Sequence, residues 1–584
     1  MRSVKEEKTN RQVAKAAGKA PINPKAFALA HMRTERGEPL DFLDRPYLVG
    51  PLVDPRVNHV VIACAQSGKT VTFLSKVFQQ LIYPVGRKSR TVIYTFPTKE
   101  DVQEFSAARA KPMIEASPLL VQEIGDLDNV MVKQFRNGST VYFRGTKTER
   151  TALSVPADIL VHDELDRSQS DTLQMYADRT RASDDPRRYL FSTPTLPKFG
   201  VSAAWEGTDQ HEWVWSCGEC GAEQVFAPMD RSVSWREHLD LEAKVFRCCR
   251  CRAAVDRKWV VAGQWVPFAP AKVSIAGYHV TGIMPPQTTA VRLADEYGKA
   301  VFEELWVQGA IGIPQASGKA EITKESIIFG EWINTLQSED RLFGGLDVGT
   351  KLDLVAGDGH GKIVAVHRLD DWGQVKSAVR TLKLRMLVVD STPEPRAVQN
   401  LMAEFPGRVL AADYTLMTVD KDPFERVATE PRVRIHRTGI LDWTRDQILM
   451  GPDGGDVWPA LPYAEAEALK DHLTNTMRQL DLDKHGNPVA TWVEVGPDHF
   501  RHAHAYYTVA AALMGGRKIG LSYVKQNTGT PHFLQELAAG QQTIKQDDEP
   551  VEMTDQLGRP VKVTRKDRMK RPILPPGSRV SKLY

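Results

Sequence analysis

NHVVIACAQSGKT, residues 58–70, is followed directly by VTFLSKVFQQLI. The apolar run 58–65 is typical of a buried strand, and the segment after Thr70 carries apolar residues at helical spacing. Between them, Ala63-x-x-x-x-Gly68-Lys69-Thr70 has the layout of a phosphate-binding loop, with Ala63 where a glycine is usual. The sequence therefore predicts a strand, a phosphate loop and a helix in succession.

The chemistry of such a loop explains why these residue types stand together. Backbone N–H groups wrap the phosphates at a helix N-terminus, a lysine reaches the β- and γ-phosphates, and a hydroxyl binds Mg²⁺. A chance Gly-Lys-Thr in an ordinary loop is the alternative, and the strand before and helix after it weaken that interpretation. We expect ATP and Mg²⁺ as ligands, with an ATP-binding set of Ala65, Gln66, Ser67, Gly68, Lys69, Thr70 and Asp163.

Two later strand ends add polar groups to this loop. ILVHDE (159–164) is an apolar strand that ends in two carboxylates. We expect Asp163 to hold Mg²⁺ through water and Glu164 to orient or deprotonate the attacking water. FSTPT (191–195) ends the next strand, and we expect Ser192 and Thr193 to couple hydrolysis to movement, although the same residues suit an ordinary turn. Arginines considered for charge stabilisation are Arg144, Arg150, Arg179 and Arg181, among which the sequence does not choose.

β-type runs at 91–96, 139–145, 157–164 and 188–195 alternate with helix-length polar segments. This alternation predicts an α/β fold with a mostly parallel sheet. A cysteine- and tryptophan-rich stretch follows, and a second αβ unit opens near residue 341. The expected division is a basic arm (1–40), a P-loop ATPase domain (41–204), a zinc-ribbon-like insert (205–285), a connecting region (286–340), an RNase H-like nuclease domain (341–516) and a basic tail (517–584).

Five of the six cysteines lie between Cys217 and Cys251. Cys217-Gly-Glu-Cys220 and Cys248-Cys-Arg-Cys251 form two C-x-x-C pairs, each able to present two thiolates to one tetrahedral ion. The 27 residues between the pairs lie somewhat outside the usual spacing. Two disulfides are the alternative, and a reducing compartment argues against them. We expect structural zinc on Cys217, Cys220, Cys248 and Cys251, with Cys249 left over.

Three aspartates stand at the ends of elements in the second αβ unit. Asp347 ends GGLD, Asp390 ends LVVD, and Asp498 opens a helix-like segment. Three carboxylates converging in this way suit two Mg²⁺ or Mn²⁺ ions, one activating water and one stabilising the leaving oxygen. Each aspartate alone is more often a cap or strand end. We expect catalytic metal ligands at Asp347, Asp390 and Asp498, with Asp353, Asp358, Asp413, His499 and His502 as supplementary groups.

Composition limits the classes of protein without identifying a partner. The 584 residues include 76 Lys+Arg and 73 Asp+Glu, so the formal net charge is only +3. A hydrophobic share of 42% with 26% charged residues is typical of globular chains and excludes a bundle of disordered tails. The sequence lacks an apolar run long enough for a membrane span, and charges occupy the N-terminal stretch where a signal peptide has its apolar core. We expect a cytoplasmic protein without membrane contact.

With these motifs in this order, the chain resembles the large terminase subunit of tailed bacteriophages, in its lambda-type, GpA-like branch. The most specific pieces are RPYLVGPLVDPRVNHVVIACAQSGKT (45–70), VHDELD (161–166) and the stretch 189–226, where paired cysteines closely follow the serine-threonine motif. The resemblance implies an ATPase that pumps double-stranded DNA into a capsid, and a nuclease that cuts concatemeric genomes. By motif match it implies the roles given above for Lys69, Thr70, Asp163, Glu164 and the three nuclease aspartates.

The resemblance also implies partners and a setting. These are double-stranded viral DNA, a small terminase subunit, the portal of the procapsid and further copies of the chain on the portal, all in the host cytoplasm. The basic arms, including RKDRMKR (565–571), are expected to contact DNA or these partners. Two alternatives remain: a helicase-like or repair ATPase whose C-terminal acids are structural, and a non-enzymatic zinc-containing DNA adaptor.

Overall fold

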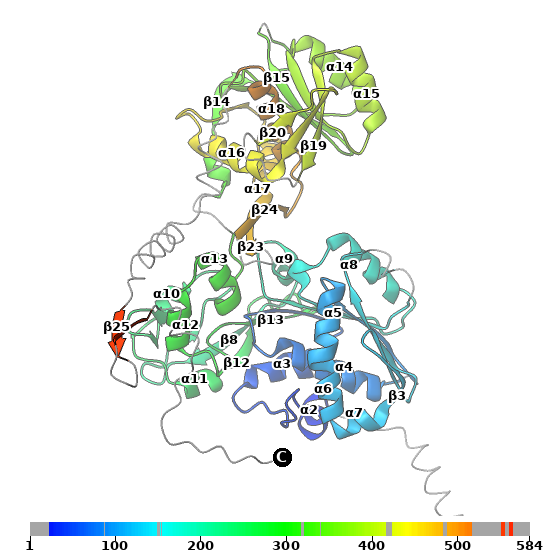
Figure 1. Ribbon diagram of the computed structural model, residues 1–584, viewed down its shortest axis with the longest axis vertical. Coiled ribbons are helices and arrows are strands. Elements are labelled where there is room, and N and C mark those ends of the chain that lie inside the picture. Colours follow the sequence, from blue (N-terminus) through cyan, green and yellow to red (C-terminus); the bar gives the residue numbers. More distant parts are fainter. Residues whose placement is uncertain are drawn as a thin grey trace, which may run out of the picture. The chain divides into compact units, whose positions relative to one another are not determined.

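The computed structural model describes residues 23–516 except 87, 149–151, 153–154, 317–320, 339, 416–422 and 483–487, together with two strands near the C-terminus (Figure 1). By contacts the chain divides into Met1–Thr418 with Phe424–Lys518, and Val419–Pro423 with Ile519–Tyr584. Of the second unit, the hairpin β25 (Val551–Thr554) and β26 (Pro560–Val563) is described. Most of both basic arms, the segment 565–571 and Arg150 lie outside the described residues.

The first large sheet has eleven strands, in the order β12-β8-β13-β1-β7-β6-β2-β5-β4-β3, with β9 paired to β8. Its strands are β1 (Asn58–Ala63), β2 (Thr91–Phe96), β3 (Ile124–Asp128), β4 (Val132–Phe135), β5 (Thr140–Gly145), β6 (Ile159–Asp163), β7 (Arg187–Ser192), β8 (His211–Ser216), β9 (Glu223–Val225), β12 (Gln264–Pro267) and β13 (Ala276–Val280). The central strands β13, β1, β7, β6, β2 and β5 run parallel to one another. The predicted mostly parallel α/β sheet is therefore confirmed.

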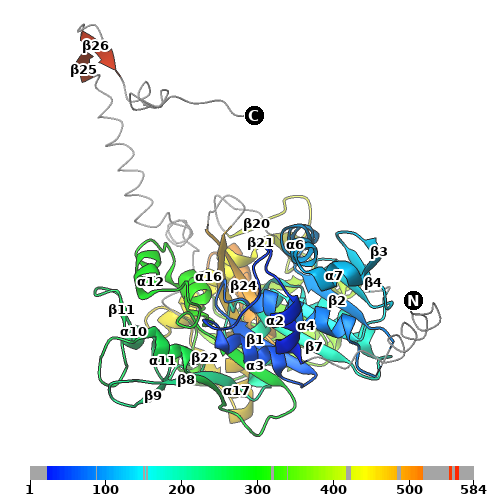
Figure 2. The same ribbon diagram turned by 90° about the horizontal axis from the view of Figure 1, so that it is seen from below.

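The helices of this part are α2 (Pro24–His31), α3 (Val49–Val53), α4 (Lys69–Ile82), α5 (Lys99–Phe105), α6 (Lys111–Ala116), α7 (Pro118–Glu123), α8 (Ser170–Ala177), α9 (Gly200–Glu206), α10 (Trp235–His238), α11 (Arg257–Val261), α12 (Ala290–Tyr297) and α13 (Glu303–Trp306). Helices α2 and α3 lie beside α4, as both views show (Figure 1, Figure 2). Alternation along β1 sends Val61 and Ala63 into the core under α4, and Val60 and Ile62 into a smaller core with α9.

The segment from 205 to 285 contributes strands to the large sheet in addition to carrying the cysteines. It supplies β8, β9, β12 and β13 to the large sheet, and β13 pairs in parallel with β1 beside the phosphate loop. A two-residue ladder of β10 (Leu239–Asp240) and β11 (Val245–Phe246) stands apart from that sheet. Tryptophans 205, 213, 215 and 235 are buried, so they pack in the core rather than forming an exposed aromatic surface.

The second sheet has seven strands, in the order β17-β16-β15-β18-β19-β21-β20. They are β15 (Phe343–Val348), β16 (Leu352–Gly357), β17 (Ile363–Leu369), β18 (Met386–Asp390), β19 (Val409–Thr415), β20 (Phe424–Arg426) and β21 (Arg432–His436). Strands β15, β18, β19 and β21 are parallel, whereas β16 and β17 form an antiparallel meander beside β15. The RNase H-like α/β sheet was predicted, although its strand β16 was not.

Helices cover both faces of this sheet (Figure 1). They are α14 (Trp372–Thr381), α15 (Pro395–Glu404), α16 (Arg437–Met450), α17 (Tyr463–Thr474) and α18 (His499–Leu513). Apolar residues of α14 and α15 join one core with β15 and β18, while α18 packs on the opposite face of β15. The short pairs β14 (Phe329–Ile333) with β22 (Trp458–Ala460), and β23 (Thr476–Leu482) with β24 (Pro488–Glu494), complete this part. Among the described residues, no helix is both long enough and apolar enough to span a bilayer.

Candidate functional site

The phosphate loop lies between β1 and α4 and is held in place from outside. Gly68 has φ +93° and precedes the first residue of α4; a Cβ there would come 2.9 Å from the Leu48 side chain. The Tyr47 hydroxyl donates a hydrogen bond to the Ser67 carbonyl at 2.9 Å, and the Gln287 amide donates to the Gln66 carbonyl at 2.8 Å. The loop shape is therefore set by a left-handed glycine, by contacts to its carbonyls and by Ala65 N, which donates to Gly309 O at 2.7 Å, and we expect the N–H groups of the following residues to bind an anion.

Lys69 contacts residues of the two other motifs, which follow β6 and β7, from its own place in the loop after β1. Its ammonium group lies 3.3 Å from Glu164 Oε1 and donates to Thr193 Oγ1 at 3.2 Å. Lys69 is nearly buried, at 8% exposure, whereas the Glu164 side chain is 35% exposed. The lysine contacts the acid after β6 and the hydroxyl after β7 at one point. This is the arrangement expected of a site that binds a phosphate and responds to it.

Asp163 and Thr70 form a second contact in the same site. The Thr70 hydroxyl donates to Asp163 Oδ2 at 3.0 Å, and the Tyr94 hydroxyl donates to the same oxygen at 3.1 Å. Burial raises the pKa of Asp163 to about 7, the nearby Lys69 ammonium lowers it and the Glu164 charge raises it further. A hydroxyl beside a buried carboxylate at the end of a strand fits a water-coordinated Mg²⁺. The Ser67 hydroxyl is buried without a hydrogen-bond partner in the described structure, which also suits a ligand at the loop.

Asp166 was not singled out from the sequence, yet it connects the two strand ends. Its carboxylate accepts hydrogen bonds from Thr195 N at 2.7 Å, Thr195 Oγ1 at 2.9 Å and Val201 N at 2.7 Å. Its own N–H donates to Ser192 Oγ at 3.3 Å. Gly200 must be a glycine here, because a Cβ would stand 2.3 Å from Asp166 Oδ1. VHDELD therefore contains a third acid, its second aspartate, whose hydrogen bonds join the ends of β6 and β7.

The arginines considered for charge stabilisation are not brought to one place. Arg181 pairs with Asp178 at 2.8 Å and its side chain is 79% exposed. The Arg144 guanidinium stacks over the Tyr142 ring, 5.2 Å from its centroid. The described structure gives neither of them a contact with Lys69 or Glu164.

The four predicted cysteine ligands meet at one point. Their sulfur atoms all lie within 4.8 Å of one another, with Cys217 to Cys251 and Cys220 to Cys248 both at 3.8 Å. A tetrahedral zinc with Zn–S bonds of about 2.3 Å has S···S edges of about 3.8 Å. A disulfide would need about 2.05 Å. The donor set therefore fits a thiophilic tetrahedral ion.

The two C-x-x-C pairs are built as the same turn. Cys217 N donates to Ala222 O at 3.0 Å and Cys248 N donates to Ala253 O at 2.9 Å. The residue that follows each second cysteine has a left-handed backbone, at φ +70° for Gly221 and φ +63° for Arg252. Two separate hairpins thus present their thiols in equivalent geometry, which a chance cluster of cysteines would not do.

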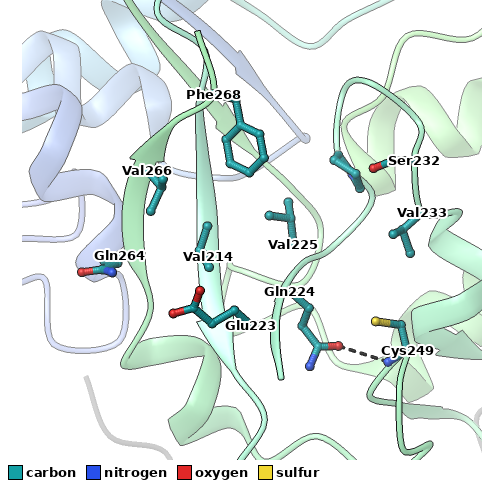
Figure 3. A pocket seen from close by; sticks show the side chains of 11 residues that line it. Val214, Glu223, Gln224, Val225, Ser232, Val233, Cys249, Gln264, Val266 and Phe268 are labelled. Carbon is teal, nitrogen blue, oxygen red and sulfur yellow. Dashed lines mark hydrogen bonds between the residues drawn. The ribbon is translucent and has the colours of Figure 1, made fainter. Parts of the chain in front are cut away.

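The leftover cysteine, Cys249, faces a different feature. It lines a pocket of about 360 Å³ whose other lining residues come from β8, β9, β12 and the loop 228–233. Figure 3 shows Val214, Val225 and Phe268 around this pocket, and the Gln224 side chain accepting a hydrogen bond from Cys249 N at 3.1 Å. Cys249 therefore stands outside the sulfur cluster, and the pocket contains none of the predicted catalytic residues.

The nuclease aspartates lie toward one edge of the second sheet. Asp347 stands near the carboxyl end of β15 and Asp390 ends β18, its parallel neighbour. Gly345 allows α18 to pack directly on β15, because a Cβ there would be 2.0 Å from Tyr507 N. Asp347, two residues further along the same face, meets the start of α18, where Asp498 precedes His499. The sheet and α18 thus carry all three acids to the same region.

Within that region each acid has its own protein partner. His499 Nδ1 lies 3.0 Å from Asp347 Oδ2, and His502 Nε2 lies 3.0 Å from Asp498 Oδ2. The Thr476 hydroxyl also donates to Asp498 at 3.1 Å, and Thr392 N donates to Asp390 Oδ1 at 3.0 Å. Burial raises the pKa of Asp390 and the Asp347 charge raises it further, against the hydrogen bond from Thr392. In the described residues, the three carboxylates do not form a group within metal-ligand distance, unlike the cysteines.

The supplementary groups divide into two kinds. Asp353 lies opposite Asp347 on β16 and is paired with Arg368 at 2.8 Å, and His499 and His502 contact the site acids directly. Asp358 instead closes a turn by accepting from His360 N at 2.7 Å. Asp413 pairs with Arg432 and Ser391. The Tyr414 hydroxyl lies 2.8 Å from His502 Nδ1. No feature of the sequence predicts that Tyr414 contacts this site.

Comparison with known proteins finds a matching family model and similar solved structures. Residues 40–265 match the family model described as "Phage terminase large subunit gpA, ATPase domain". The crystal structure of the HK97 bacteriophage large terminase matches with TM-score 0.51 and 12% identity, over 84% of this chain and 99% of that one. The large terminase of the thermophilic bacteriophage D6E gives TM-score 0.30 and 11% identity, over 81% and 98% of the two chains. A search of curated proteins found no match.

The HK97 similarity shows a shared fold, while the family model covers the residues that carry the phosphate loop, the acidic pair and all four clustered cysteines. The predicted resemblance to phage large terminase subunits is thereby confirmed, with residues 40–265 matching the family model of the gpA-type terminase ATPase domain.

Proposed function

We propose that this protein is an ATP-driven motor that packages double-stranded DNA and carries a metal-dependent endonuclease that cuts concatemeric viral DNA. The observation that supports it most is the contact of Lys69 with both Glu164 and Thr193, since it joins a phosphate loop, a catalytic acid and a coupling hydroxyl at one point. Further support comes from the acids of the RNase H-like sheet, in the same chain as a terminase ATPase domain.

In this proposal the residues of the first sheet have separate tasks. Bound ATP with Mg²⁺ supplies the phosphoryl group and the charge that neutralises it. Lys69 contacts the phosphates, Thr70 and Asp163 hold the ion, and Glu164 orients the attacking water. Ser192 and Thr193 sense the phosphate, and Asp166 connects them to the acidic strand end through Thr195 and Val201.

The remaining assignments are proposed on the same basis. Asp347, Asp390 and Asp498 offer hard oxygen ligands to Mg²⁺ or Mn²⁺, and Cys217, Cys220, Cys248 and Cys251 offer thiolates to structural zinc. The partners are double-stranded DNA, a small terminase subunit, the portal and further copies of the chain, in the host cytoplasm. We also propose the division into a P-loop ATPase domain, a zinc-ribbon-like insert and an RNase H-like nuclease domain with basic ends. The insert strands β8, β9, β12 and β13 belong to the ATPase sheet.

The test is cleavage of supercoiled plasmid by the full chain with Mn²⁺, alongside ATP hydrolysis. We expect Asp347→Asn to remove cleavage while ATP hydrolysis continues, because the two sets of residues lie in separate sheets. Asp358→Asn, which changes a carboxylate in a turn of the same sheet, is the matched control and should cleave normally. A wild-type chain that unwinds duplexes but leaves plasmid intact would favour the helicase-like alternative, and one without ATP turnover the adaptor.

A further inference from the structure

The amino edge of the second sheet, opposite the aspartates, carries a hollow lined almost entirely by cations. Its volume is about 440 Å³, and its lining residues are Arg341, Arg380, Lys383, Leu384, Arg385 and Arg408. Arg341 precedes β15, Arg385 precedes β18, and Arg408 precedes β19. Because these three strands are parallel neighbours, their amino ends meet at one edge.

The backbone explains why these side chains share the hollow. Arg385 N donates to Leu342 O at 2.7 Å, and Leu387 N donates to Arg408 O at 2.8 Å. The backbone pairing of β15, β18 and β19 therefore extends to the residues that line the hollow. α14 ends at Thr381 and places Arg380 in its last turn; Lys383, with φ +50°, then turns the chain into β18. Two of the five cations have structural tasks. The Arg408 guanidinium donates to the Leu384 carbonyl, and Arg380 pairs with Glu404.

The other cations of the hollow are directed to solvent. Arg341, Lys383 and Arg385 are exposed, and within the described residues neither Arg341 nor Arg385 forms an ion pair. No carboxylate lines the hollow, since Glu404 is already shared by Arg380 and Lys376 outside it. The neighbouring like charges of Arg341 and Arg385 repel one another, so this edge gains stability whenever an anion enters.

The chemistry of the lining suits phosphate groups, and in a chain proposed to handle DNA the duplex backbone is their source. Four of the five cations are arginines, whose planar guanidinium forks match phosphate oxygens in a bidentate manner and keep their charge at any working pH. The hollow is also separated from the aspartates by the length of β15, which at about 3.3 Å per residue is roughly 20 Å. A phosphate held here is therefore remote from the bond that is cut.

We propose that this hollow binds backbone phosphates of DNA at a second position on the nuclease sheet, away from the cleavage site. The inference rests on the proposed function only in taking DNA as the ligand. The contact is independent of base sequence and of divalent metal. This contact adds affinity for DNA and holds the duplex even when no metal ion is bound to the aspartates.

The experiment measures binding of a 30-base-pair fluorescent duplex to the full chain in EDTA, by anisotropy at several salt concentrations. We expect Arg341→Ala with Arg385→Ala to reduce the slope of log affinity against log salt by about two, since each lost phosphate contact removes about 0.9. Arg341→Lys with Arg385→Lys should keep most of the slope, because the charges remain. The control is Lys111→Ala with Lys258→Ala, which removes two exposed cations elsewhere and should leave the slope unchanged.

An unchanged slope in the arginine-to-alanine variant overturns the proposal and leaves an acidic protein partner as the occupant to seek. Displacement of the duplex by a few millimolar inorganic phosphate at constant ionic strength also overturns it, because the hollow then takes the small anion. Plasmid cleavage by the wild-type chain is measured separately. A chain whose slope falls as expected but which cuts no DNA supports the hollow while contradicting the nuclease.

Discussion

The two carboxylate sites of this protein differ in how far they are assembled without ligands. In the first, Glu164 contacts Lys69 and Asp163 accepts hydrogen bonds from Thr70 and Tyr94, so the acids are already turned toward the residues they work with. In the second, Asp347 and Asp498 are each turned to a histidine, and the carboxylates do not meet at ligand distance in the described residues.

Electrostatics explains this difference. A lysine inside the first site offsets the repulsion between two neighbouring carboxylates, so they can stay close in the free protein. In the second site, within the described residues, neither a lysine nor an arginine side chain forms an ion pair with Asp347 or Asp498, whose imidazole partners are His499 and His502. The first site is therefore preorganised by a residue of the chain, whereas the acids of the second site have separate partners, and we expect bound metal ions to bring them together.

The largest effect is expected at the preorganised site. Glu164→Gln keeps the size of the side chain but removes the group that activates water, so ATP hydrolysis should fall by about 10²–10⁴-fold. ATP binding should persist, because Lys69 and the loop are unchanged. Hydrolysis is followed by phosphate release and binding by a fluorescent nucleotide. Glu115→Gln, on an exposed glutamate of α6, serves as the control, and unaltered turnover in Glu164→Gln would move the catalytic acid elsewhere.

The cysteine cluster is an intermediate case, since its ligands are at metal distance without any cation of the chain among them. Cys217→Ser should remove bound zinc and lower the melting temperature by about 5 °C or more, equivalent to roughly 2 kcal/mol. Cys249→Ser should do neither, because Cys249 lines the neighbouring pocket instead. Zinc is measured by elemental analysis of the purified chain and stability by calorimetry. Equal effects in both variants would contradict the four-cysteine site.

Much of the first site could be predicted from sequence because its signals are local. A strand, Gly-Lys-Thr and a helix lie within one stretch, and the acids come at the end of an apolar run. The strand β13 could not be placed this way, since Ala276–Val280 pairs with β1 more than two hundred residues earlier in the chain. The sequence assigns this stretch to the zinc-ribbon-like insert and indicates no pairing with β1. Asp166 was missed for the same reason, because its partners Thr195 and Val201 are distant in sequence.

The second site shows a further limit of sequence reasoning. The positions of Asp347, Asp390 and Asp498 at element ends follow from apolar runs and a helix start, but their side-chain partners do not. His499 and His502 were considered as supplementary groups, and it is the packing of α18 against Gly345 that decides which acid each one contacts. Tyr414 becomes a partner of His502 through a fold contact across 88 residues.

The smallest expected effect is a change in the stability of the second site. Its sign tests the difference in electrostatics between the two carboxylate sites. Asp390→Asn keeps the oxygen that accepts from Thr392 but removes a half-buried charge close to Asp347, so in EDTA the variant should be slightly more stable than the wild-type chain. Because the folded protein raises the pKa of Asp390 above its ordinary 3.8, the penalty is present at neutral pH and disappears as the pH falls below that value.

Adding Mn²⁺ should reverse the order, since metal stabilises the wild-type chain and finds one carboxylate fewer in Asp390→Asn. Unfolding in urea at pH 7.5 and pH 4, with EDTA or Mn²⁺, measures both effects. Asp358→Asn, in the turn of the same sheet, is the control and should show no gain. A loss of stability for Asp390→Asn in EDTA at pH 7.5 would mean that its charge is already offset by the chain. The second site would then be preorganised like the first.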